Sequence, residues 1–371
     1  MIRILHVVSG LECGNGVMNI IMNYYRNIDK KKIQFDFLYW LDDERSKTYT
    51  NEIKELGGNI YYIRKPRLNK NSYSEIKNFF KRYASNYKAL HLHEVYLNMI
   101  IAPMARKYGI KHIIAHSHTT KYSDIKLNAI RNRMLCLPLK YNTDIYLACS
   151  KAAGEFLYGK KYVQSGKVKV IKNAIDCEKF RYKEEVRREK RKEFNVEDKF
   201  VVGHIGRFNE QKNHEFLVDI FFEIYNKNKK SVLMLVGDGP LIEKIKSKVN
   251  KLKITDHVLF LGQRTNVEEL LQVMDTFILP SLFEGLGIVL IEAQSTGLSC
   301  IASDVVPIDV KVTDQVSFIN LKQTADLWAE FALMNFKKSK RYDCSKDVHK
   351  AGYDIKLQTG QLEDLYLNLT Y

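Results

Sequence analysis

The chain has 371 residues, more than one hydrophobic core usually organises, so we expect two domains. Hydrophobic residues make up 45% of it and no apolar run reaches the roughly 20 residues that span a bilayer, which argues against a disordered chain and against an integral membrane protein. The six cysteines include no Cys-x-x-Cys pair, which favours reduced thiols in the cytoplasm over a disulfide framework.

The net charge of +16 is unevenly distributed along the chain. Residues 1–175 contain 30 Lys and Arg against 13 Asp and Glu, whereas residues 176–371 contain 29 against 30. A basic first half favours an anionic partner, such as anionic lipid, nucleic acid or a phosphorylated acceptor. The alternative is a lysine-rich surface that serves only solubility. The sequence shows no interleaved aromatic and basic residues and no known reader motif, so we do not expect a nucleic-acid partner.

In the first half, short apolar runs alternate with amphipathic stretches. The apolar start of the chain leads through glycines into a helical pattern, so we interpret residues 2–8 as a strand and not as a signal peptide. This alternation predicts a parallel sheet with helices on both faces. Further strands are predicted at 35–40, 60–63, 89–93, 112–115, 145–149 and 167–171, and helices at 17–25 and 50–56.

The pattern restarts after a charged segment, residues 178–199, which suits an exposed helix or a linker. Two successive series of strands and helices predict an α/β protein with two Rossmann-like domains. In the second series, strands are predicted at 200–206, 231–236, 258–261, 276–279 and 300–302, and helices at 213–225, 241–249 and 355–369.

Residues 280–297, PSLFEGLGIVLIEAQSTG, combine two glutamates with a glycine turn. The turn Gly285-Leu286-Gly287 follows Glu284, and a helix is predicted to begin near Ile288, with Glu292 about two turns into it. Glycines at a helix start let a diphosphate approach backbone amides at the positive end of the helix. Carboxylates beside it accept hydrogen bonds from sugar and ribose hydroxyls. The alternative interpretation is two ordinary surface glutamates.

A second segment, residues 202–213 with the sequence VGHIGRFNEQKN, supplies cations at the end of a predicted strand. Arg207 offers a planar fork and Lys212 a point charge, and both are suited to neutralise a diphosphate. The alternative is a strand end with two surface cations.

Together, these two segments resemble glycosyltransferase family 4. The setting FEG-x-G-x4-E-A of Glu284 and Glu292 looks like the Glu-x7-Glu signature of this family, and GRFNEQKN is similar to its G-R-x4-K-N element. The resemblance implies a retaining enzyme in which Glu284 contacts the donor sugar and Glu292 the ribose of the nucleotide. It also implies that Arg207 and Lys212 stabilise the leaving diphosphate without a metal.

The same resemblance implies the GT-B fold, two Rossmann-like domains facing each other across a cleft. We expect an acceptor-side domain at 1–175, a donor-binding domain at 176–354, and a helix at 355–371 that returns to the first domain. The glycine-rich loop Gly10–Gly16 resembles the loop after the first strand of the family and adds Gly16 to the site. The expected donor site comprises Gly16, Arg207, Lys212, Glu284, Gly285, Leu286, Gly287, Ile288 and Glu292.

Histidines follow two predicted strands of the first half, His91 and His93 in HLHE and His116 and His118 in HSH. They are therefore expected at the carboxyl edge of the sheet. The resemblance implies that His118 lies beside the donor sugar and acts in catalysis, with His116 as the alternate. No thiolate joins these histidines, so we do not expect a zinc site. A core or capping role stays open for His91 and His93.

The sequence thus predicts a metal-independent glycosyltransferase whose donor is a nucleotide-diphosphate sugar, with UDP as the expected nucleotide, and which has no cofactor. The expected acceptor is a lipid-linked or anionic saccharide in capsule or exopolysaccharide synthesis, at the inner face of the plasma membrane. The basic clusters Lys30–Lys32 and Arg64–Arg67 would contact an anionic leaflet. The alternative function is a nucleotide-sugar epimerase or hydrolase on the same scaffold.

Overall fold

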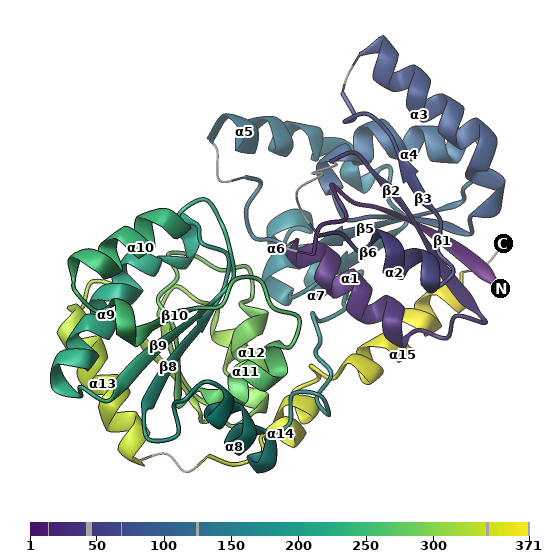
Figure 1. Cartoon of the computed structure of the whole chain (residues 1–371). Helices are drawn as coiled ribbons and strands as arrows, with labels where there is room; N and C mark the ends of the chain where they lie inside the picture. The colour runs from purple at the N-terminus through teal and green to yellow at the C-terminus, as the bar shows by residue number, and fades with distance from the viewer. Residues whose placement is uncertain (14, 42–46, 68, 124–125, 339–340, 370–371) are drawn as a thin grey trace. The chain divides into compact units, whose positions relative to one another are not determined.

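The computed structural model describes residues 1–13, 15–41, 47–67, 69–123, 126–338 and 341–369. The chain divides into two compact units. Unit 1 consists of Met1–Ala174 with Ile355–Tyr371, and unit 2 of Ile175–Asp354. Each unit contains a parallel sheet with helices packed on it, so the predicted α/β class with two Rossmann-like domains is confirmed (Figure 1).

Unit 1 has a sheet of seven strands in the order β3-β2-β1-β4-β5-β6-β7. The predicted strands are confirmed, with ends that differ by one or two residues. The strands are β1 (Ile2–Val7), β2 (Ile33–Tyr39), β3 (Ile60–Tyr62), β4 (Ala89–Leu92), β5 (His112–Ser117), β6 (Ile145–Ala148) and β7 (Val168–Val170). The helices are α1 (Gly16–Asn27), α2 (Thr50–Glu55), α3 (Lys70–Tyr83), α4 (Asn98–Lys107), α5 (Lys126–Leu135), α6 (Lys151–Tyr158), α7 (Lys160–Gln164) and α15 (Ile355–Leu367).

Helices α1 and α15 lie side by side on one face of this sheet (Figure 1). Their apolar residues share one core with β1 and β2. The carboxylate of Glu363 accepts a hydrogen bond from the backbone N of Asp29 at 2.6 Å, and the side chain of Gln358 accepts one from the backbone N of Lys172 at 2.9 Å. The last helix therefore belongs to unit 1 although the chain reaches it through unit 2.

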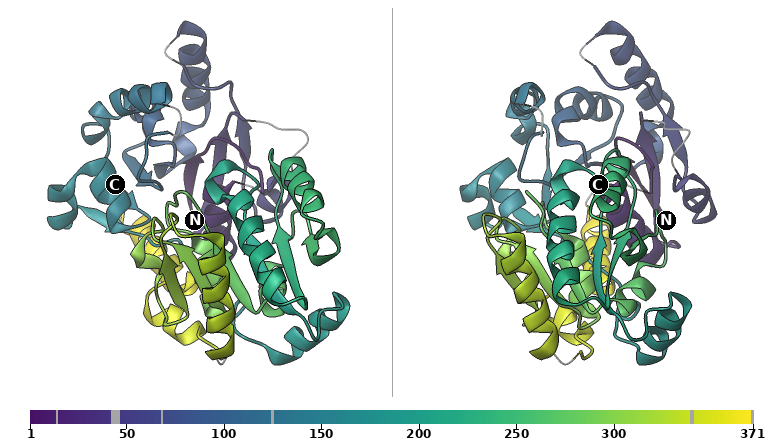
Figure 2. Two further views of the ribbon diagram at one scale, coloured as in Figure 1. Left: turned by 90° about the vertical axis from the view of Figure 1, so that its left-hand side faces the viewer. Right: turned by 60° about the vertical axis from the view of Figure 1, so that its left-hand side comes forward.

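Unit 2 has a sheet of six strands in the order β10-β9-β8-β11-β12-β13. Helices α9, α10 and α13 pack on one face, and α8, α11, α12 and α14 form the other layer (Figures 1 and 2). The strands are β8 (Phe200–Ile205), β9 (Ser231–Val236), β10 (Val258–Phe260), β11 (Thr276–Leu279), β12 (Ser299–Ser303) and β13 (Val316–Ile319). The helices are α8 (Glu184–Glu193), α9 (His214–Lys227), α10 (Ile242–Lys251), α11 (Val267–Val273), α12 (Ile288–Ser295), α13 (Ala325–Lys338) and α14 (Ser345–Lys350).

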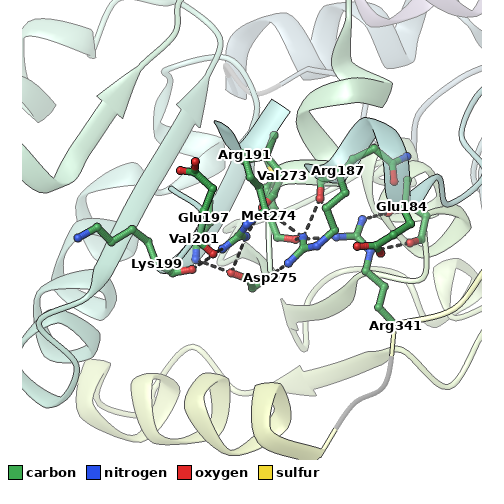
Figure 3. A network of polar contacts seen from close by, with 12 residues as sticks. Glu184, Arg187, Arg191, Glu197, Lys199, Val201, Val273, Met274, Asp275 and Arg341 are labelled. Atoms are coloured by element: carbon green, nitrogen blue, oxygen red, sulfur yellow. Dashed lines mark hydrogen bonds and ion pairs between the residues drawn. The ribbon is translucent and has the colours of Figure 1, made fainter. Parts of the chain in front are cut away.

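The charged segment before β8 is not a linker, because its helix α8 is bound to the core of unit 2 through two arginines (Figure 3). Arg187 and Arg191 contact the buried carboxylate of Asp275 at 2.5 and 3.0 Å. Asp275 also accepts a hydrogen bond from the backbone N of Val201 at 2.8 Å. The interpretation of this segment as exposed is therefore wrong for its arginine face, since a buried carboxylate requires cationic or hydrogen-bonding partners.

Candidate active site

The carboxylate of Glu284 is held between a lysine and a serine in unit 2. Nζ of Lys212 lies 2.6 Å from Oε1 of Glu284, and the same oxygen accepts a hydrogen bond from Oγ of Ser281 at 2.7 Å. Nε2 of Gln211 donates to Oε2 at 3.4 Å. The side chains of Glu284 and Lys212 are 6% and 15% exposed. The fold thus brings together two predicted site residues from segments 72 positions apart.

Local turn chemistry places Lys212. Oδ1 of Asn209 accepts a hydrogen bond from the backbone N of Lys212 at 3.2 Å and so begins the short helix η4 (Glu210–Lys212). Asn213 then adopts a left-handed conformation with φ 54°, which asparagine tolerates better than most residues. Its side chain donates to the carbonyl of Pro280 at 3.1 Å. The loop after β8 is therefore tied to the segment that carries Glu284.

Two glycines after β9 let a second loop lie against the loop after β8. A Cβ on Gly237 would lie 2.1 Å from the carbonyl O of Gly206, and one on Gly239 would lie 2.5 Å from that of Phe208. The backbone N of Phe208 donates to the carbonyl of Asp238 at 2.9 Å. These glycines therefore permit a close backbone approach that shapes the site.

The glycine turn before α12 has the predicted form. Gly287 has φ +79°, a left-handed conformation that favours glycine, and α12 begins at Ile288 as predicted. Leu286, inside the turn, is buried in the core of unit 2. The prediction that Glu292 lies about two turns into the helix is wrong. It lies four residues after Ile288, and a turn takes about 3.6 residues, so Glu292 is just over one turn in.

Glu292 is half-buried, and burial raises its pKa to about 7. The charge of Lys179 lowers this pKa and the carboxylate of Glu268 raises it. Nζ of Lys179 lies 3.1 Å from Oε1 of Glu268, so the lysine also pairs with that carboxylate. Glu292 therefore changes its charge near neutral pH, a property typical of functional carboxyl groups.

Arg207 is exposed on the loop after β8, and its guanidinium makes no ion pair within the described ranges. Gly16 is in unit 1, where it begins α1 beside the capping side chain of Asn15. No described atom lies within 4 Å of a Cβ built on Gly16, so packing inside unit 1 does not require glycine there. Gly14 of the same predicted loop lies outside the described residues.

The predicted histidine pairs form one cluster with a further histidine, His6 of β1. Strands β1, β4 and β5 are neighbours in the sheet, and the register pairs His6 with His91. Side chains alternate along a strand with a period of two, so His91 and His93 share one face, as do His116 and His118. The cluster therefore lies on a single face of the unit 1 sheet, below α1 and α15.

Two rows of hydrogen-bonded groups run through this cluster. In the first row, Nδ1 of His6 lies 2.9 Å from Nε2 of His93, and Nδ1 of His93 lies 2.8 Å from Nε2 of His118. The second row joins Tyr366 Oη to Nδ1 of His91 at 2.6 Å and Nε2 of His91 to Nδ1 of His116 at 3.2 Å. The hydrogen-bonded position of His118 is thus set by residues inside the sheet.

Burial lowers the pKa of every histidine in the cluster, to about 3 for His6 and about 4 for His118. All five are therefore neutral at pH 7. Their nitrogens also form two groups of three within 4.8 Å, His6 with His91 and His93, and His93 with His116 and His118. The close pairs within these groups, His6 with His93 and His93 with His118, have hydrogen-bond distances of 2.9 and 2.8 Å, so in each pair one nitrogen donates and the other accepts.

Sequence reasoning missed three residues of these sites: Ser281, Gln211 and His6. Ser281 and Gln211 lie inside the two quoted motifs, but only the folded loops show that they bind Glu284. The signal that could have revealed His6 is a histidine within the first predicted strand. In the sheet, this strand is β1, which lies next to β4 with His91 and two strands away from β5 with His116.

The chain is similar to known glycosyltransferases in sequence and in fold. Residues 186–332 match the family model described as Glycosyl transferases group 1. The chain is 32% identical to the putative glycosyltransferase EpsF of Bacillus subtilis, over 98% of this chain and 96% of that protein. It is 26% identical to the UDP-Gal:alpha-D-GlcNAc-diphosphoundecaprenol alpha-1,3-galactosyltransferase of Escherichia coli, over 76% of each chain. Its fold matches Anabaena HepE in complex with UDP and glucose, with a TM-score of 0.80 at 15% identity, over 99% of this chain and 100% of that one. These matches give no support to the epimerase or hydrolase interpretation.

Proposed function

The chain belongs to the group 1 glycosyltransferases, and from this premise we propose that it transfers a sugar, with retention of configuration, from a UDP-sugar to a hydroxyl of a lipid-linked saccharide. The observation that carries the proposal is the carboxylate of Glu284, held by Lys212 at the glycine-turned start of α12. The names of two similar proteins support it, since one acts on a diphosphoundecaprenol-linked sugar and the other binds UDP and glucose.

The diphosphate binds, in this proposal, at the amino end of α12. Backbone amides after Gly287 and the positive end of the helix attract it. The exposed guanidinium of Arg207 supplies a planar fork, and Lys212 shares its charge between Glu284 and the phosphate. Two cations then balance the charge that develops on the leaving diphosphate, so the reaction does not depend on a divalent metal.

In this proposal Glu284 binds the sugar and does not attack it: Lys212 and Ser281 contact its Oε1, and Oε2, with Gln211 at 3.4 Å, is left to accept a hydrogen bond from a sugar hydroxyl. The acceptor hydroxyl approaches the anomeric carbon from the side on which the diphosphate leaves. The bond between that carbon and the phosphate oxygen breaks, and its electron pair stays on the phosphate. The same phosphate oxygen takes the proton of the acceptor hydroxyl, so the new glycosidic bond keeps the original configuration.

Glu292 binds the ribose in this proposal. Calorimetric titration with UDP tests the assignment, because Glu292→Ala then weakens UDP binding while Glu284→Ala mainly slows turnover. Glu243→Ala, which removes an exposed carboxylate of α10, is the matched control. Unchanged UDP affinity in Glu292→Ala would reject the ribose assignment.

We propose further that unit 1 contacts an anionic membrane surface through α5 and the short helix η3 (Leu137–Lys140). Apolar side chains recur here at helical spacing, and Leu127, Leu137 and Tyr141 are 79%, 71% and 88% exposed. Residues 126–141 contain four Lys and Arg and no Asp or Glu. An exposed apolar stripe with flanking cations is typical of helices that lie in a membrane interface.

The basic cluster Lys30–Lys32 is less suited to this contact than the sequence indicates. Nζ of Lys30 donates to the carbonyl of Arg26 at 2.8 Å at the end of α1, and Lys32 pairs with Asp29 at 3.3 Å. Within the described ranges, no helix is long and apolar enough to cross a bilayer.

A further inference from the structure

The strand order in the sheet of unit 1 reverses between β1 and β4, since β2 and β3 lie on one side of β1 and β4 to β7 on the other. The helices that follow these two neighbouring strands lie on opposite faces of the sheet. Ile4 of β1 packs in one core with α1, whereas Leu5 packs in another core with α4. In open α/β sheets, ligands bind outside the carboxyl ends of the strands at such a reversal. The carboxyl ends of β1 and β4 are therefore the reversal point of unit 1.

Polar side chains follow both strands at the reversal point. Ser9 comes after β1, Glu94 comes after β4, and Tyr96 lies in the short helix η2 (Val95–Leu97). The two strands stay paired almost to these residues, because the backbone N of His93 donates to the carbonyl of Val7 at 3.2 Å. Ser9, Glu94 and Tyr96 are each half-buried, so each keeps some exposed surface. The fold thus places one carboxylate and two hydroxyls at the reversal point.

The carboxylate of Glu94 has capacity for further hydrogen bonds. Burial raises its pKa, whereas hydrogen bonding by the side chains of Ser9 and Tyr96 and the charge of Lys65 lower it. Within the described ranges, Glu94 forms no ion pair. An ionised carboxyl group accepts about four hydrogen bonds, so two hydroxyl donors leave about two positions for a ligand. A half-buried carboxylate without a cationic partner is stabilised by such donors.

The start of α1 disfavours a phosphate at the reversal point. In dinucleotide-binding domains, a phosphate at this place uses the free amides at the start of the helix after the first strand. Here Oδ1 of Asn15 accepts hydrogen bonds from the backbone N of Val17 at 3.0 Å and from that of Met18 at 3.3 Å. These amides are therefore occupied, and the carboxylate of Glu94 repels an anion. Both features favour a neutral ligand that carries hydroxyl groups.

We propose that Ser9, Glu94 and Tyr96 bind a neutral saccharide ring at the reversal point of unit 1, with Glu94 accepting hydrogen bonds from its hydroxyls. Ser9 and Tyr96 hold the carboxylate, and their own oxygens accept from the sugar. The sugar site itself rests on the geometry of unit 1. Its assignment to the acceptor saccharide rests on the proposed function, in which the proton of the reacting hydroxyl still goes to the leaving phosphate.

Direct binding tests the sugar site without turnover. The probes are the methyl glycosides of glucose, galactose and N-acetylglucosamine, and the measurement is saturation-transfer NMR on the full chain. The proposal expects transfer to at least one glycoside, its loss in Glu94→Gln and its retention in Glu284→Ala, because Glu284 belongs to unit 2. The control Glu55→Gln removes an exposed carboxylate of α2 and should bind like the wild type.

Three results would overturn the proposal: no transfer to any of the glycosides, transfer that persists in Glu94→Gln, and displacement of the bound glycoside by inorganic phosphate, which would indicate an anion site. If Glu94→Gln unfolds at a much lower temperature than the wild type, Ser9→Ala and Tyr96→Phe carry the test. Each removes one hydroxyl and keeps the carboxylate, so each should weaken glycoside binding severalfold, and unchanged binding in both would contradict the site.

Kinetics separates this inference from the proposed function. The substrates are the UDP-sugar that the enzyme uses fastest and a series of sugars joined through a diphosphate to a short alkyl chain. Glu94→Gln should raise the KM for the acceptor on the order of tenfold, because hydrogen bonds to a charged group are weakened, while calorimetry should show unchanged UDP affinity. If glycoside binding depends on Glu94 but the acceptor KM does not, the sugar site stands and its assignment to the acceptor is wrong. If no UDP-sugar supports transfer, the proposed function fails and NMR still decides the site.

Discussion

Nζ of Lys212 and Oε1 of Glu284 lie 2.6 Å apart, and this contact joins the loop after β8 to the segment before α12. Both groups are mostly buried, so each depends on the other for compensation of its lost hydration. The contact therefore links the stability of unit 2 to the charge of the proposed diphosphate site.

Replacing Lys212 by Met leaves the Glu284 carboxylate buried without its cation. We expect the free energy of unfolding to fall by about 3 kcal/mol and UDP affinity to fall at least about tenfold. Adding Glu284→Gln should restore most of the stability but not the UDP binding, because it removes the unpaired charge and not the need for a cation. Urea unfolding and calorimetry measure both effects. The control Lys246→Met breaks an exposed pair with Glu243 and should change stability by under about 1 kcal/mol.

Part of the affinity for UDP should depend on the ionisation of Glu292. Burial raises the pKa of this carboxyl group to about 7. A carboxylate accepts a stronger hydrogen bond from a ribose hydroxyl than a carboxylic acid does, so this component rises as the pH increases through about 7. Calorimetry at about pH 6 and about pH 8 compares the wild type with Glu292→Gln. The ionisation of UDP itself affects both proteins equally. An equal pH dependence of UDP affinity in the wild type and in Glu292→Gln would therefore contradict the assignment.

The same raised pKa has a consequence for stability with a defined sign. The folded state binds the proton of Glu292 more tightly than the unfolded state, so this contribution to stability is complete below about pH 4.5 and is lost as the pH rises through about 7. The difference in free energy of unfolding between Glu292→Gln and the wild type should therefore favour the variant more at about pH 8 than at about pH 5.

Transfer activity should persist in excess EDTA, because the proposal assigns the charge of the diphosphate to Arg207 and Lys212. The measurement is product formation before and after complete removal of divalent cations. A loss of activity that manganese or magnesium restores would contradict the proposed mechanism and would direct attention to the histidine cluster.

Stability should decrease on acidification below about pH 6.5, because burial lowers the pKa of the histidine cluster in the folded state. Unfolded histidine binds the proton more tightly, so this stability is complete above about pH 6.5 and is lost toward about pH 4. Each such histidine contributes up to about 1.4 kcal/mol per pH unit. Urea unfolding at several pH values should show a shallower dependence in His6→Phe. Replacement of the exposed His349 by Gln is the control, and a slope change there as large as in His6→Phe would contradict the explanation.

Binding to anionic liposomes should depend on the apolar side chains of α5 and η3. Replacing Leu127, Met134 and Leu137 by Gln should abolish co-sedimentation with anionic vesicles while the fold is kept, since these side chains are exposed. The matched control replaces Leu327 and Met334, exposed apolar residues of α13 in unit 2. Equal pelleting of the wild type with neutral and anionic vesicles would leave the basic charge as a feature of solubility.

The sequence by itself determined the features that depend only on residues close together along the chain. Strand and helix periodicity predicted both sheets, and the glycine turn predicted the start of α12 at Ile288, because turn conformation and helix initiation are local. The two motifs likewise indicated the family, because each is a short contiguous segment.

Only the tertiary structure decided which of these residues meet. Strand order and register bring His6 to His91 and Lys212 to Glu284, and neither follows from periodicity within one strand. The charge pattern of α8 is likewise typical of a solvent-exposed helix. Only the tertiary structure shows that Asp275 lies beneath this helix and pairs with its arginine face. The apolar stripe of α5 shows the converse. A helical pattern with one apolar face is the same in sequence whether a neighbour covers that face or not, so only packing reveals that it is exposed.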